Sequence, residues 1–190
     1  MPGVNVSFDL RGVEELRGRI DAAIRKGKDF SPALKKTGML MYASIAKNFR
    51  MEGRPERWKP LKRVTIARRR KGPGVGSPKI LQDTGRLRQS VTSAHGPNSI
   101  YRLSSTQLVL GTNLKYARIH QEGGTTGPVT IVPRRKKALH WINEAGQHVF
   151  AKKVNHPGSK IPARPFLIFQ EEDKRNIKAL MLEHLMEVWQ

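Results

Sequence analysis

A chain of 190 residues with 37% hydrophobic residues is long enough to form one domain with a sizeable core. It contains no cysteine, which excludes disulfides and cysteine-ligated metal sites, and no apolar run approaches the roughly 18 residues of a membrane span. The 36 Lys and Arg residues against 15 Asp and Glu give a formal charge of +21, which favours a polyanionic partner, nucleic acid first. The first twenty residues lack the apolar stretch of an export signal.

Two amphipathic helices are predicted at the start of the chain. Aliphatic residues recur at helical spacing in residues 12–26, and Gly27 is a typical stop. Residues 31–50 keep one face apolar, with Ser31 as the helix cap and Pro32 at the first helical position. We expect these two helices to form a hairpin with both apolar faces packed into the core.

The segment 53–79 breaks this periodicity. It holds four prolines and four glycines with almost no apolar spacing, and it is too long for an ordinary connection. We interpret it as either a functional basic arm or a segment that is disordered in isolation, and we expect it to be extended with few contacts to its own body. The residues of the arm that are candidates for contacts are Arg54, Arg57, Trp58, Lys59 and Leu61.

The middle of the chain combines short helices with strands. Residues 83–90 are predicted to form a short helix capped by Asp83 or Thr84, whose side chains can accept a backbone hydrogen bond. Residues 99–104 and 107–111 alternate as a strand pair. The further elements expected here are a helical stretch over 114–121 and a hairpin of 138–143 with 148–154.

A last helix is predicted after Pro165, because acidic residues 171–173 suit its first turns and apolar residues follow at helical spacing. Its expected buried side consists of Ile168, Ile177, Leu180, Met181, Leu185 and Val188. Helices before and after a small antiparallel sheet give an α+β fold. We expect one domain over residues 1–190, with the basic arm at about 53–79.

The positive charge is concentrated in two blocks. Residues 47–90 carry fourteen basic and three acidic side chains, and residues 134–164 carry eight and one. A charge run is often only a solvated surface, but arginines beside Pro- and Gly-rich segments can reach phosphates and acidic protein surfaces alike. Both kinds of partner stay open, and the scarcity of aromatic residues argues against single-strand reading. The candidate contact residues are Arg63, Arg68, Arg69, Arg70, Lys71, Arg134, Arg135, Lys136 and Lys137.

The motifs for catalysis or metal binding are incomplete. The Asp-Thr-Gly tripeptide at 83–85 occurs once and lacks the apolar strand of an aspartic protease, so only a dimeric enzyme could use it. The His-Gln-Glu at 120–122 is half of a zinc deaminase motif whose cysteine partners are missing. The glycines of 72–76 lack the Lys-Ser/Thr of a phosphate loop. We therefore predict no enzymatic activity, no metal and no cofactor.

A series of motifs in a fixed order extends from about residue 31 to residue 189. Each motif is weak alone, but their order and spacing together are fairly specific. They are Gly53-Arg54-Pro55, Trp58-Lys59-Pro60-Leu61, Ile80 to Ser90, Leu110-Gly111-Thr112-Asn113, Tyr116-Ala117, His120 to Gly124 and Ile161 to Leu167. On these residues the sequence resembles the Mu-like phage virion morphogenesis family, which also contains tail-completion proteins.

The resemblance implies a non-enzymatic structural protein of the head–tail junction or tail end of a phage. It implies a homo-oligomeric ring, a hexamer or dodecamer, that joins head and tail and contacts neck, portal or tail proteins, with packaged double-stranded DNA as a further candidate partner and no membrane. Assembly in the host cytoplasm and a final place in the virion follow. The implied structural core includes Tyr116, Phe166 and Leu167. With this resemblance, the arm residues named above are expected to make assembly contacts with a neighbouring subunit or neck protein, and the arm to become ordered on assembly.

The strength of the basic blocks departs from the family pattern, so a second interpretation is kept. It is a free duplex DNA-binding protein without sequence preference that acts in packaging or assembly.

Overall fold

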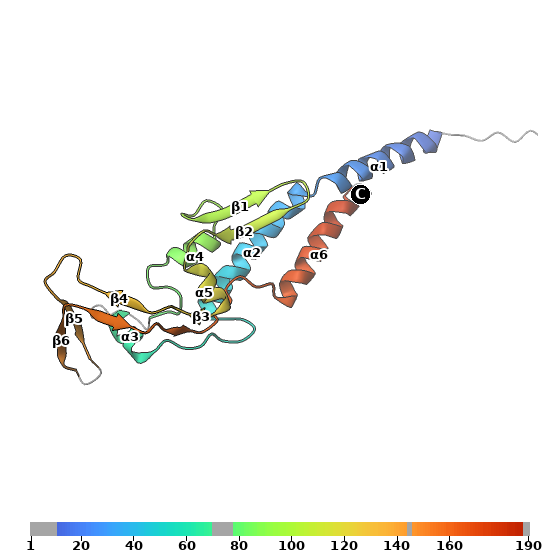
Figure 1. Ribbon diagram of the computed structural model, residues 1–190. Coiled ribbons are helices and arrows are strands. Elements are labelled where there is room, and N and C mark those ends of the chain that lie inside the picture. Colours follow the sequence, from blue (N-terminus) through green and yellow to red (C-terminus); the bar gives the residue numbers. More distant parts are fainter. Residues whose placement is uncertain (1–10, 70–77, 144–145, 188–190) are drawn as a thin grey trace, which may run out of the picture. The chain divides into compact units, whose positions relative to one another are not determined.

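The computed structural model describes residues 11–69, 78–143 and 146–187. The chain forms two compact units, Met1–Leu114 with Phe166–Gln190 and Lys115–Pro165. Figure 1 shows long helices in the first unit and a ribbon of strands in the second. Helices and antiparallel strand pairs in one chain confirm the predicted α+β class.

Three helices organise the first unit: α1 (Arg11–Lys28), α2 (Ser31–Met51) and α6 (Glu171–Met186). α2 packs against α6, and α1 contacts the same helix, with an ion pair between Lys26 and Glu187. The predicted N-terminal helical pair is therefore present. Figure 1 shows α1 leading away from α2 instead of folding back along it, so α6 takes the place of the expected hairpin contact.

The start of α2 differs in detail from the prediction. Phe30 occupies the N-cap position and Ser31 is the first helical residue, so Ser31 is not the cap. Asp29 instead accepts a hydrogen bond from the Ser31 backbone N–H at 2.9 Å. Hydrogen bonds from the side chain and backbone of Ser31 hold the pKa of the Asp29 carboxyl below its ordinary value. Pro32 lies in the first turn, where its missing N–H has no intrahelical partner to lose.

Two short helices and one strand pair complete the first unit: α3 (Arg63–Arg69), α4 (Arg86–Val91), β1 (Ser99–Leu103) and β2 (Leu108–Thr112). The strands pair antiparallel with Tyr101 opposite Leu110, as the alternation predicts. α4 and both strands pack against α2. α4 follows Gly85 and has no side-chain cap, which corrects the predicted capping role of Asp83 and Thr84.

The core of the first unit includes an aromatic cluster beside the C-terminal half of α2. The ring of Phe49 is fully buried and its centroid lies 5.6 Å from that of Trp58 and 5.8 Å from that of Phe166. The first of these pairs meets edge to face, at an interplanar angle of 82°, an arrangement that aromatic rings favour. Burial of these rings joins α2, the start of the predicted arm and the segment before α6.

The predicted last helix is α6, but its most buried residues are polar. Asp173 and His184 are buried, and His184 Nε2 lies 2.8 Å from the carbonyl oxygen of Asp29. The helix residues predicted for the buried side are only half-buried: Ile177, Leu180, Met181 and Leu185. Ile168 precedes the helix, and Val188 lies outside the described residues.

The second unit consists of one short helix and a two-stranded ribbon. Its elements are α5 (Ala117–Glu122), β3 (Gly124–Thr125), β4 (Val129–Ile131), β5 (Leu139–Ile142), β6 (His148–Ala151), β7 (Val154–His156) and β8 (Lys160–Ile161). The strands pair antiparallel as β3 with β8, β4 with β7, and β5 with β6, the last being the predicted hairpin. The expected small sheet is thus distributed over separate two-stranded pairs.

Candidate functional site

The predicted basic arm is anchored to its own unit at both ends. Trp58 is buried against Phe49, and its backbone N–H donates a hydrogen bond to the carbonyl of Glu52 at 2.7 Å. At the far end, the backbone N–H of Ile80 donates to the carboxylate of the same Glu52 at 2.7 Å. The expectation that the arm makes few contacts with its own body is therefore wrong at its start.

The turn at Gly53 brings the chain back onto α2. Its φ of 116° is a conformation that L side chains rarely adopt. A Cβ at this position would lie 2.4 Å from the carbonyl oxygen of Glu56 and 2.6 Å from the backbone nitrogen of Trp58. Glycine is thus required for the close approach that places Trp58 in the core.

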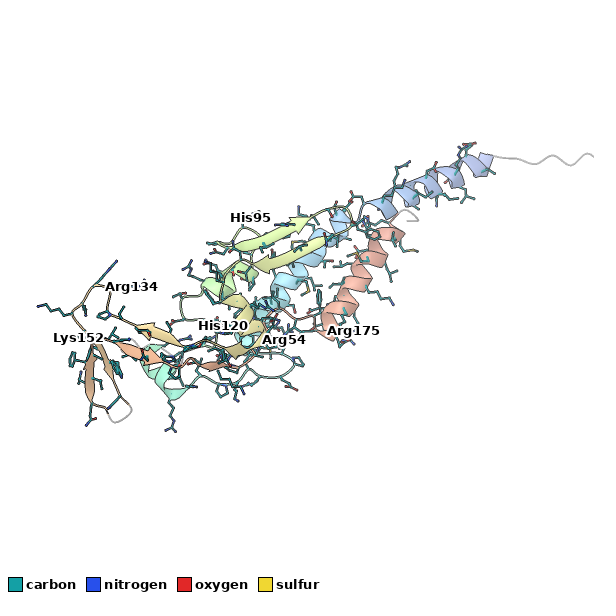
Figure 2. All side chains as sticks on the ribbon, viewed as in Figure 1. Arg54, His95, His120, Arg134, Lys152 and Arg175 are labelled. Carbon is teal, nitrogen blue, oxygen red and sulfur yellow. The ribbon has the colours of Figure 1, made fainter. Side chains whose placement is uncertain are left out.

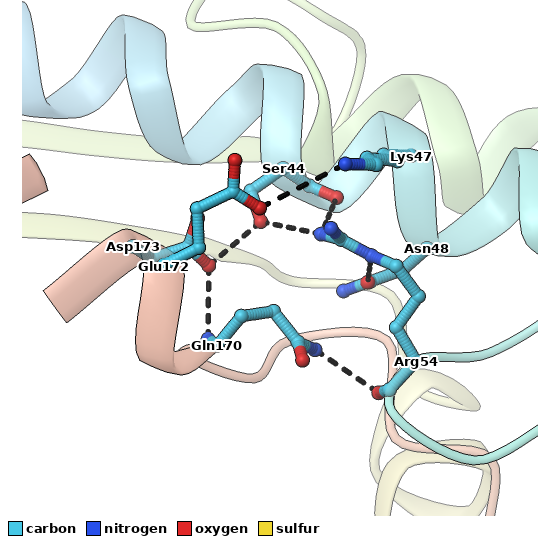
Figure 3. A network of polar contacts seen from close by, with 7 residues as sticks. All are labelled: Ser44, Lys47, Asn48, Arg54, Gln170, Glu172 and Asp173. Carbon is cyan, nitrogen blue, oxygen red and sulfur yellow. Dashed lines mark hydrogen bonds and ion pairs between the residues drawn. The ribbon is translucent and has the colours of Figure 1, made fainter. Parts of the chain in front are cut away.

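Arg54 belongs to a polar network between α2 and α6, drawn in Figure 3. Its Nε donates to Asn48 Oδ1 at 2.8 Å, and its Nη2 donates to the carbonyl of Ser44 at 2.9 Å and to its hydroxyl at 2.7 Å. The hydroxyl of Ser44 in turn donates to the buried carboxylate of Asp173 at 2.7 Å. The side chain of Gln170 donates to the carbonyl of Arg54 at 3.0 Å. These contacts give Arg54 a structural role in its own subunit, unlike the assembly contact predicted for it.

The part of the arm beyond its anchored start reaches solvent. The side chains of Arg57, Lys59 and Arg63 are exposed, and Leu61 is half-buried. Residues 63–69 form α3, so this stretch is helical where the sequence predicts an extended chain. Assembly contacts through the exposed residues stay a proposal.

The first arginine cluster is only partly described. Arg69 donates a hydrogen bond to the carbonyl of Lys79 at 3.1 Å, and its Nε lies 3.6 Å from a carboxylate oxygen of Asp83. These contacts turn Arg69 toward its own unit. Arg70 and Lys71 lie outside the described residues. For Arg68 the structure describes the backbone and not the side chain.

The second basic cluster lies on a loop between β4 and β5, and all four side chains of 134–137 are exposed. No ion pair involves them within the described ranges. The structure also places Lys152 and Lys153, which the sequence did not single out, on the opposite strand at the same level as this loop, between the residue pairs Ile131–Val154 and Leu139–Ala151. Their position follows from strand register, a long-range property that leaves no local signal in the sequence.

The three residues implied as structural core differ in how far their side chains are buried. Phe166 is 1% exposed and Leu167 is half-buried. Tyr116 is 41% exposed, which corrects its assignment to the core. The reason is the start of α5, where the neighbouring Ala117 is the buried residue and Tyr116 instead contacts the ring of His120 edge to face, at a centroid distance of 6.0 Å.

An open pocket on the first unit lies between α2 and β1. Burial raises the pKa of the Tyr42 phenol in its wall, with a smaller contribution from nearby Tyr101. One of the residues that line it is His95, which is labelled in Figure 2. The lining residues are Lys35, Gly38, Met39, Tyr42, Ser93, Ala94, His95 and Tyr101.

The described residues include a pair of histidines but no cluster suited to a metal ion. Among the residues described, no three His, Asp or Glu side chains are arranged to hold a metal ion. His140 Nε2 and His148 Nδ1 lie 2.7 Å apart on the exposed β5–β6 hairpin, with their rings stacked. None of the helices in the described part is long and apolar enough to cross a membrane.

Because the resemblance implies a structural phage protein without catalysis, Asp83→Asn should leave both the melting temperature and virion assembly unchanged. The side chain of Asp83 is exposed, it does not cap α4, and its ion pair with Arg69 spans 3.6 Å with the carboxylate in contact with solvent, so the pair contributes little to stability. The measurements are thermal unfolding of the purified variant and an electrophoretic comparison of virion proteins from a phage that carries it. An unprocessed capsid or tail protein in the variant phage would reveal a protease function of the Asp-Thr-Gly tripeptide.

Comparison with known proteins covers almost the whole chain. Residues 12–186 match the sequence profile of the phage virion morphogenesis family. The chain is also similar to the Mu-like prophage FluMu G protein 2 of Haemophilus influenzae, with 27% identity over 185 residues that cover 97% of this chain and 96% of that protein. No solved structure matches. The matched range includes the whole second unit and residues 12–114 and 166–186 of the first.

Proposed function

The chain belongs to the phage virion morphogenesis family, and from this premise we propose that it is a non-enzymatic structural component of the phage head–tail junction. Its subunits would form a homo-oligomeric ring that joins head and tail. Family membership itself places the protein in phage virion assembly, among other virion proteins. The observation that carries the proposal is the extent of the family match, residues 12–186, which extends over both units. We infer that both units belong to one virion morphogenesis domain.

Exposed apolar residues on α1 support an assembly role. A ring of identical subunits needs two different surfaces that fit one another. Residues Val13, Leu16, Ile20 and Ile24 are each 44–52% exposed, and their helical spacing places them along one face. Exposed apolar patches on soluble proteins commonly mark protein–protein contacts. We assign this stripe to contact with a neighbouring subunit or another virion protein.

The charge sets a condition on ring formation. A formal charge of +21 on each subunit makes identical subunits repel one another. Salt screens such repulsion beyond about 10 Å at 0.1 M. The basic surfaces therefore face DNA or acidic partner surfaces in the particle, and ring formation requires a partner or raised ionic strength.

Removal of this chain from a phage that encodes it should separate heads from tails. The expected result by electron microscopy is filled heads and finished tails that accumulate unjoined, because the junction between them lacks one component. Expression of the unaltered chain in the same cells should restore joined particles. Joined, infectious particles formed without the chain would refute the proposal.

A free duplex DNA-binding protein is the second candidate, favoured by the exposed basic loop at 134–137. Native mass with and without DNA, at low and raised salt, separates the two. A ring-sized species at raised salt, and the chain in purified virions, would support the junction protein. A monomer or dimer that binds duplex DNA and is missing from virions would support the alternative.

A further inference from the structure

In the second unit, strand pairing is interrupted between the β4–β7 pair and the β5–β6 pair. The last residue pair of β4 and β7 is Ile131 with Val154, and the first pair of β5 and β6 is Leu139 with Ala151. Between these pairs, one strand contains the seven residues 132–138 and the other contains only two. The surplus residues must leave the ribbon as a loop.

Six cations meet at this interruption, which we call the elbow and define as residues 132–138 with Lys152 and Lys153. The loop contributes Arg134, Arg135, Lys136 and Lys137, and the short strand contributes the two lysines. All six side chains are exposed. Figure 2 shows Arg134 and Lys152 at this level of the ribbon.

The elbow is not neutralised by its surroundings. Residues 123–165 contain eight basic residues and one acidic residue, Glu144. Among the described residues, no ion pair involves any of the six cations of the elbow. An uncompensated cluster of this kind attracts a dense array of negative charge, such as the duplex phosphates at one charge per about 1.7 Å of helix axis.

The residue types favour nucleic acid over an acidic protein. Four of the six cations are lysines, and lysine is depleted at protein–protein interfaces while it is a common donor to DNA phosphates. A two-stranded antiparallel ribbon also fits within the width of the major groove of B-form DNA. We propose that the elbow binds the phosphate backbone of duplex DNA without reading its sequence. The inference rests on the proposed function, because a junction ring surrounds the path of the DNA.

The test is binding of short labelled DNA duplexes of two unrelated sequences to the full-length protein, measured by fluorescence anisotropy over a salt series. Each phosphate contact adds about 0.9 to the slope of log affinity against log salt, so six contacts contribute about 5. The elbow variant should therefore lose most of that slope and at least about tenfold in affinity at low salt. In the elbow variant, glutamine replaces each of the six basic residues Arg134, Arg135, Lys136, Lys137, Lys152 and Lys153.

A matched control separates the site from net charge. Removing six charges from +21 leaves +15 in either variant, so an effect of net charge alone would be equal in both. The control should keep nearly the full slope. In the control variant, glutamine replaces six exposed basic residues outside the elbow: Arg17, Arg25, Lys28, Lys35, Lys115 and Lys178. Equal melting temperatures of the two variants establish that both remain folded.

Three results would overturn the inference. The first is an equal loss of affinity in the elbow and control variants, and the second is wild-type affinity in the elbow variant. The third is competition by polyglutamate as effective as by unlabelled duplex at equal charge, which would identify an acidic protein surface as the ligand. If DNA binding at the elbow fails while loss of the chain still separates heads from tails, the proposed function stands without it. If the elbow binds DNA but heads and tails join normally without the chain, the inference about DNA binding stands and the proposed function at the junction is wrong.

Discussion

Replacing Phe166 by alanine should lower the free energy of unfolding by about 3–5 kcal/mol. The side chain is 1% exposed, and its ring lies 5.8 Å from that of Phe49. Its carbonyl also accepts a hydrogen bond from the side chain of Asn48 at 3.1 Å, which fixes the segment before α6 against α2. Removing the ring leaves a cavity between these elements that the rigid helix cannot fill. Urea unfolding followed by circular dichroism measures the change.

Phe169→Ala is the matched control for this experiment. Phe169 lies in the same segment, has the same side chain and is 58% exposed, so its truncation removes little buried surface. The expected change is below about 1 kcal/mol. Equal unfolding midpoints for the two variants would mean that the segment before α6 is peripheral to the core.

The elements with a local signal could be predicted from the sequence. β1 at Ser99–Leu103 and β2 at Leu108–Thr112 agree with the predicted strands within a few residues, because alternation over a short run reports directly which side chains share a face. α2 ends at Met51, one residue past its predicted end, because Gly53 interrupts the apolar pattern there. Such agreement requires no knowledge of tertiary contacts.

The features that the sequence could not predict depend on distant parts of the chain. Trp58 is in the core because Gly53 turns the chain back and Phe49 offers a ring to pack against, whereas its own neighbours are polar. Asp83 does not cap α4, since capping depends on backbone angles that residue type alone leaves open. The meeting of the loop 132–138 with Lys152 depends on strand register in the same way.

The helix α1 illustrates a different limit. Its apolar spacing predicts correctly that the helix is amphipathic, but we expected its apolar face to pack into the core of the same chain. The structure leaves Leu16 and Ile20 about half exposed, at 50% and 44%. A hydrophobic stripe indicates that a face is to be covered, and it does not say by which molecule. This is the physical reason that an assembly surface resembles a core helix in the sequence.

The carboxylate of Asp173 connects the first turn of α6 to α2. Its Oδ2 accepts hydrogen bonds from the hydroxyl of Ser44 at 2.7 Å and from the backbone N–H of Gln170 at 2.9 Å. Figure 3 shows the guanidinium of Arg54 on the other side of Ser44, so positive charge lies one hydrogen bond beyond the carboxylate. Asp173 is 4% exposed, so water cannot replace these partners.

Asp173→Ala should therefore lower the free energy of unfolding by about 2–4 kcal/mol, because it leaves the buried hydroxyl of Ser44 and the backbone N–H of Gln170 without their acceptor and removes the negative charge near the half-buried guanidinium of Arg54. Urea unfolding measures the change, and Asp173→Asn, which keeps an acceptor oxygen but removes the charge, should give a smaller loss. The control is Glu172→Ala at the adjacent position, where the side chain is exposed and its ion pair with Lys47 spans 3.8 Å. If Asp173→Ala and Glu172→Ala unfold at the same urea concentration, the network in Figure 3 does not stabilise the contact between α6 and α2.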